Sequence, residues 1–186
     1  YNEHVVKLEH CLFDIRRKKN STTMKKLFYV FTFIVALCFL SIGFVFGGEH
    51  GEDRGFNSEI DWYNDLEEAK EAAQAQGKPI FLLIHKSWCG ACKRLKPEFQ
   101  GSLVIESTSK HFIMVNLEDD EEPTDERYRP DGAYVPRIFF LDENGDVLND
   151  THNKNGNPKY QHFFPQYNQV TETMTHALEV YRQQKQ

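Results

Sequence analysis

Residues 79–92 read PIFLLIHKSWCGAC, an apolar run followed by two cysteines that stand three positions apart. A continuous apolar run between turn residues is typical of a β-strand that is buried on both faces. The residues from Cys89 onward read as a helix, so the strand leads directly into a helix whose first turn carries Cys89 and Cys92. The sequence therefore predicts a strand–helix junction with a paired thiol at its start.

The chain on either side of this junction continues the mixture of helices and buried strands. The expected elements are a helix from residue 61 that ends at Gly77-Lys78-Pro79, a helix over 89–106 that Pro97 interrupts, strands at 111–117, 137–142 and 147–148, and a helix over 170–181. This order joins a parallel strand pair to an antiparallel one. It predicts an α/β domain with a central mixed sheet and helices on both faces, and the Trp-Cys-x-x-Cys motif makes the class thioredoxin-like.

The two cysteines at the junction are suited to thiol–disulfide exchange. This chemistry needs a thiolate nucleophile and a second thiol that resolves the mixed disulfide. The backbone N–H groups and the dipole of a helix N-terminus favour a thiolate at Cys89, and Cys92 lies on the same helix face within disulfide reach. Trp88, Gly90 and Ala91 are the supporting residues, since the two small residues allow a tight first turn.

Half of a zinc site is the alternative interpretation of a Cys-x-x-Cys pair. Structural zinc takes four ligands, commonly from two such pairs, and this chain has no second pair. His85 at the strand end is as readily a buried core histidine as a ligand. The ligand count favours redox chemistry without a metal.

The charge of the chain is unevenly distributed. Seven of its 22 basic and three of its 28 acidic residues lie in 1–47, so residues 48–186 carry a net charge of −10. An acidic domain gains nothing from counterion release on a polyphosphate, which argues against nucleic-acid binding. The acidic run 118–122 lacks the ligand spacing of an EF-hand loop and is expected to be a solvated loop.

The N-terminal part predicts an export signal. Residues 24–47 begin with Met24-Lys25-Lys26 and continue as an apolar run, the form of a secretory signal. The run at 27–46 is also long enough to span a bilayer, so an uncleaved anchor, with membrane contact through it, is the alternative. The expected division is an upstream or non-native extension at 1–23, the signal at 24–47, a linker at 48–57 and a thioredoxin-like domain at 58–186.

Several stretches of this domain match a known family. They are Lys86–Lys93 (KSWCGACK), Met114–Asp119 (MVNLED) with its acidic continuation, Pro130-Asp131-Gly132, Val135-Pro136-Arg137 and Asn155–Pro158 (NGNP). With these, the chain over about residues 56–182 resembles the small thioredoxin-like oxidoreductases of the endoplasmic reticulum that are related to the anterior-gradient proteins.

The resemblance implies roles for individual residues. It implies that Cys89 is the nucleophile, that Cys92 is the resolving thiol and that Pro136 is a cis-proline that faces the active site. Cysteine-containing client proteins and glutathione are the implied partners, with no cofactor beyond this exchange. The buried acidic residue that many thioredoxins carry six positions before the first cysteine is replaced by Leu83. The chain ends at 182–186 as RQQKQ rather than in the family's retrieval signal, so either the C-terminus is truncated or the protein leaves the endoplasmic reticulum. The expected location is the endoplasmic reticulum lumen or outside the cell.

Two functional hypotheses follow. The first is a protein-thiol disulfide oxidoreductase of the secretory pathway that uses the Cys-Gly-Ala-Cys dithiol. The second is a client-binding or scaffolding module with little redox turnover, for which Cys92 would be dispensable. An aromatic tract at 160–167 is either a client-binding patch or part of the core, and the core is favoured.

Overall fold

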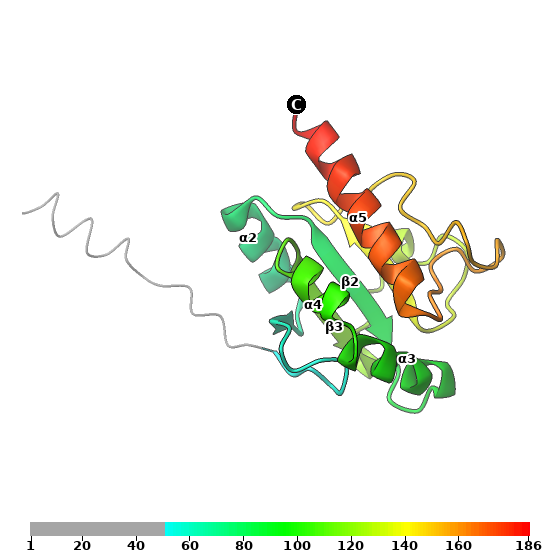
Figure 1. The fold of residues 1–186 in the computed structure, drawn as a ribbon. Helices are drawn as coiled ribbons and strands as arrows, with labels where there is room; N and C mark the ends of the chain where they lie inside the picture. Colours follow the sequence, from blue (N-terminus) through cyan, green and yellow to red (C-terminus); the bar gives the residue numbers. More distant parts are fainter. Residues whose placement is uncertain (1–50) are drawn as a thin grey trace, which may run out of the picture. The chain divides into compact units, whose positions relative to one another are not determined.

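A four-stranded mixed sheet organises residues 51–186, the part of the chain that this computed structural model describes (Figure 1). The strands, in spatial order, are β1 (Trp62–Tyr63), β3 (Ile113–Glu118), β2 (Ile80–His85) and β4 (Arg137–Leu141). The β3 strand runs parallel to both β1 and β2, whereas β4 is antiparallel to β2. The predicted central mixed sheet is confirmed. The expected extension at 1–23 and the expected signal or anchor at 24–47 lie outside the described residues.

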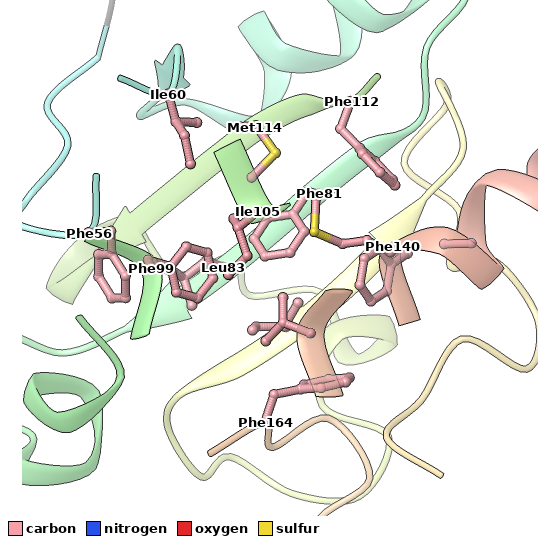
Figure 2. Packing of buried hydrophobic residues seen from close by; sticks show 14 of the residues in the cluster. Phe56, Ile60, Phe81, Leu83, Phe99, Ile105, Phe112, Met114, Phe140 and Phe164 are labelled. Atoms are coloured by element: carbon pink, nitrogen blue, oxygen red, sulfur yellow. The ribbon is translucent and has the colours of Figure 1, made fainter. Parts of the chain in front are cut away.

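Helices cover both faces of this sheet. Three of them, α3 (Gly90–Gln100), α4 (Leu103–Ser109) and α5 (Tyr167–Gln184), pack on one face, and α2 (Leu66–Gln76) packs on the other. Alternate β2 side chains separate accordingly: Phe81 and Leu83 enter the first core, which Figure 2 shows, and Ile80, Leu82 and Ile84 enter the second. Every residue of β2 is buried, as its apolar run predicts.

The predicted helix over 89–106 is divided into two helices, and the break lies at Gly101-Ser102 rather than at Pro97. Ser102 begins α4 because its Oγ accepts a hydrogen bond from the Ile105 N–H at 3.2 Å. Pro97 stays inside α3. The helix cap at Ser102 therefore sets the boundary between α3 and α4, which the sequence had placed at Pro97.

The first predicted helix begins later than the periodicity indicated. Trp62 is not helical but lies in β1, with its indole N–H donated to the carbonyl of Asn57 at 2.9 Å. The helix α2 starts at Leu66, where the Asp65 side chain accepts hydrogen bonds from two backbone N–H groups of the first turn. Its end is the predicted one, because Gly77 adopts the left-handed conformation with φ of 62°.

Residues 51–57, expected to be part of a linker, pack onto the domain. Phe56 is fully buried in the core of Figure 2, Gly51 forms a β-bridge with Trp62, and Arg54 forms an ion pair with Glu121. The large apolar ring of Phe56 explains the difference, since its burial requires this segment to lie against the sheet. The domain in this structure thus includes residues before 58.

The aromatic tract at 160–167 is divided between core and surface. Phe164 is fully buried, whereas Tyr160 and Tyr167 are 36% and 48% exposed.

The expected strand at 147–148 is reduced to a single bridge between Val147 and Leu141. Among residues 51–186, no helix combines the length and the apolar character that crossing a membrane requires.

Candidate active site

The chain passes from the end of β2 to α3 (Figure 1), and Cys89 is the N-cap residue of α3. Its backbone is extended, with φ of −76° and ψ of 121°, and its Sγ accepts a hydrogen bond from the Cys92 N–H at 3.1 Å. The sulfur therefore occupies the place of a capping oxygen at the helix N-terminus. Both cysteines are free thiols in this structure.

The two cysteines differ in accessibility and in protonation. Cys89 retains 7% exposure, whereas Cys92 is fully buried. Burial, and secondly the hydrogen bond with Cys89, raises the pKa of the Cys92 thiol to about 12. Cys92 therefore stays protonated near neutral pH, and only Cys89 can be approached from outside.

The supporting residues of the motif lie where the sequence placed them. Gly90 and Ala91 form the first turn of α3, and the Trp88 side chain is 73% exposed beside Cys89. An aromatic residue this exposed adds nothing to the core of the domain, so it is free to contact another molecule.

A second loop reaches Cys89 from the start of β4. The Cys89 thiol donates a hydrogen bond to the carbonyl of Val135 at 3.7 Å, and the Val135–Pro136 peptide bond is cis. Pro136 itself is buried. The structure thus brings the Cys-Gly-Ala-Cys motif and the Val135-Pro136 backbone together.

Asp119 tethers the segment that leads into Cys89. Its Oδ1 accepts a hydrogen bond from the Ser87 N–H at 3.0 Å, and its backbone carbonyl accepts one from Lys86 Nζ at 2.6 Å. The hydrogen bonds from Ser87 lower the pKa of the Asp119 carboxyl, so it remains ionised. Asp119 also has a positive φ of 51°.

The sequence predicted that the acidic run 118–122 is a solvated loop. In the structure, several of its carboxylates instead form ion pairs within the domain. Glu122 is the centre: it pairs with Lys86 at 2.7 Å, with Arg137 at 2.6 Å and with Arg129 at 3.2 Å. Burial acts to raise the pKa of Glu122, but the hydrogen bonds from Lys86 and Arg137 outweigh it and the pKa is lowered. Glu122 therefore joins the segment before Cys89 to the strand that follows Pro136.

Arg137 is the most buried member of this group. Its guanidinium donates to the carbonyls of Tyr128 and Tyr134 as well as to Glu122, and its side chain is inaccessible. Sequence reasoning assigned no role to Asp119, Glu122 or Arg137. All three lie in stretches that carry the family resemblance, Glu122 in the acidic continuation after Asp119, and this was the available signal.

The residues next to the motif on β2 cannot exchange protons with it near neutral pH. Leu83 is fully buried and apolar. His85 is also fully buried, lies 2.6 Å from Asn116 Oδ1 through its Nε2, and has its pKa lowered to about 4, chiefly by burial. It is a neutral core histidine. Within residues 51–186, no group of three or more His, Cys, Asp or Glu side chains is arranged to hold a metal ion.

A family model described as thioredoxin-like matches residues 61–143. Anterior gradient protein 2-B of Xenopus laevis is 32% identical over 125 residues, which are 67% of this chain and 75% of that protein. Anterior gradient protein 3 of Mus musculus is 33% identical over 126 residues, again 67% and 75% of the two chains.

Solved structures with a similar backbone include an uncharacterised thioredoxin-like protein from Clostridium perfringens. It has a TM-score of 0.46 and 21% identity, over 72% of this chain and 90% of that one. A second is the DsbH oxidoreductase, with a TM-score of 0.38 and 21% identity, over 50% of this chain and 72% of that one.

Proposed function

This chain belongs to the anterior gradient family, and we propose that it is a thiol–disulfide oxidoreductase that acts through Cys89 and Cys92. The observation that carries the proposal is the asymmetry of the pair. Cys89 caps α3 and keeps some exposure, whereas Cys92 is buried with a raised pKa. Cys89 is thus suited to attack a client disulfide, and Cys92 is suited to resolve the mixed disulfide that forms.

In the reducing direction, the Cys89 thiolate attacks one sulfur of a client disulfide and the first client thiolate leaves. Cys92 then loses its proton and attacks the Cys89 sulfur, which releases the second client thiolate and leaves a Cys89–Cys92 disulfide. Two electrons pass from the protein to the client. Because the Leu83 side chain cannot accept a proton, the Cys92 proton passes to water or to another group. Oxidation of a client runs through the same steps in reverse.

The sequence also supports a proposal about which member of the family this chain resembles and where it acts. Within the family, the stretch KSWCGACK at 86–93 favours a protein of the kind of thioredoxin domain-containing protein 12. The basic and apolar pattern of 24–47 supports entry into the secretory pathway, with residence in the endoplasmic reticulum lumen or secretion. Glutathione and cysteine-containing client proteins are the proposed partners, without a further cofactor.

A redox titration tests the activity. The purified protein is equilibrated in glutathione buffers of graded ratio, quenched with acid and analysed by mass spectrometry. We expect wild type to pass between a dithiol and an intramolecular disulfide, while Cys92→Ala forms a glutathione adduct on Cys89 instead. Absence of the intramolecular disulfide at every ratio would reject the proposal and favour the client-binding module.

A further inference from the structure

Arg94 places a positive charge beside the cysteine motif. Its Nη1 lies 3.6 Å from the position that a Cβ atom on Gly90 would occupy, and Gly90 stands between the two cysteines. The side chains of Arg94 and its neighbour Lys93 are exposed, and within residues 51–186 neither forms an ion pair or a hydrogen bond. Arg94 is therefore free to contact a molecule that approaches Cys89.

The carboxylates near this site are already engaged elsewhere. Asp119 accepts hydrogen bonds through its side chain from Ser87, and Glu122 pairs with Lys86 and Arg137. Glu98, on the same helix as Arg94, accepts a hydrogen bond from the Tyr167 N–H at 3.0 Å. Within residues 51–186 no carboxylate forms an ion pair with Arg94, although the net charge over 48–186 is −10.

We propose that Arg94 is a specificity-determining residue that favours disulfide substrates with carboxylates close to the sulfur. This inference rests on the proposed function. A cation beside the Cys-Gly-Ala-Cys motif attracts an anionic substrate and repels a cationic one, while the acidic remainder of the domain acts in the opposite sense at longer range. A preference for anionic disulfides therefore depends on the positive charge at position 94. A change in the total charge of the domain would not reproduce it.

Two small symmetric disulfides of opposite charge serve as probes: glutathione disulfide, which is anionic, and cystamine, which is cationic. With either one, the Cys89 thiolate displaces one thiolate from the probe, and Cys92 displaces the second while the protein disulfide forms. Two electrons pass from the protein dithiol to the probe. The two protons of the cysteines pass through water to the released thiolates.

The experiment compares oxidation rates of the reduced protein with each probe by stopped-flow tryptophan fluorescence. We expect Arg94→Gln to lower the glutathione disulfide rate by about two- to fivefold, the size of an exposed ion pair, and to leave the cystamine rate equal or higher. Arg94→Lys should keep most of the wild-type preference. Raised ionic strength should reduce the difference between wild type and Arg94→Gln.

Lys110→Gln is the matched control, because it removes the same charge at the opposite end of the sheet. Lys110 precedes β3, and the first residue of β3 pairs with the first residue of β2. Lys110 is therefore near the end of the sheet where β2 begins, whereas Cys89 follows the last residue of β2. The control should keep the wild-type ratio of the two rates. An unchanged ratio in Arg94→Gln, or an equal change in Lys110→Gln, would overturn the inference. If neither probe oxidises wild type, the proposed function fails instead.

Discussion

The thiol of Cys89 lies 3.7 Å from the carbonyl oxygen of Val135, which is 46 residues further along the chain. The antiparallel register of β2 and β4 accounts for this contact, because Ile84 near the end of β2 pairs with Arg137 at the start of β4. The residues that follow one strand and precede the other therefore emerge at the same edge of the sheet. A molecule attached to the Cys89 sulfur would meet the Val135 backbone directly.

The difference between the two thiols predicts selective alkylation. In the reduced protein at pH 6, iodoacetamide should modify Cys89 at least about a hundredfold faster than Cys92, because burial holds the Cys92 pKa near 12 and closes access to it. Peptide mapping by mass spectrometry over time measures both rates. Equal rates, or a faster Cys92, would reverse the assigned roles.

Removal of the resolving thiol should trap intermediates. Cys92→Ala should accumulate disulfide-linked adducts with glutathione or client proteins, since nothing displaces the client from Cys89. The matched variant Cys89→Ala should form few adducts, because Cys92 is fully buried. Non-reducing gels of secretory-pathway extracts compare the two. Similar adduct levels in both variants would instead support a client-binding module.

The ion pairs of Glu122 should stabilise the domain. Glu122→Gln leaves the inaccessible Arg137 guanidinium without its counter-charge, which should lower the free energy of unfolding by roughly 3 kcal/mol. Glu126→Gln is the control, since Glu126 is 86% exposed and lies 4.0 Å from Arg129, and it should cost less than about 1 kcal/mol. Urea unfolding measures both variants. A loss as small as that of the control would show that Glu122 is not structurally required.

His85 should make the stability depend on pH. Burial lowers its pKa from 6.5 to about 4, so the unfolded chain binds a proton in this window that the folded chain does not. The free energy of unfolding therefore falls as the pH is lowered from 6.5 to 4, by about 3 kcal/mol from this residue. His85→Gln should unfold with a flatter pH dependence, whatever its stability at pH 7. Equal slopes for the two proteins across this window would contradict the prediction.

Much of the architecture could be read from local patterns. The apolar run of β2, the Cys-x-x-Cys pair at a helix start and the glycine that ends α2 each depend on residues within a few positions of one another. The boundaries that differed were set by competing local contacts. Asp65 and Ser102 supply caps that outweigh the apolar periodicity near Trp62 and the proline in α3.

The sequence by itself thus determined the fold class, the central strand and the position of both thiols at the N-terminus of α3. Only the tertiary structure decided how the site is held and what surrounds it. Asp119 meets Ser87 over 32 positions, and Glu122 meets Arg137 over 15. The acidic run that looked solvated forms partly buried ion pairs, and Phe56, from an expected linker, completes the core. Sheet pairing and packing create these contacts, and no periodicity of the chain encodes them.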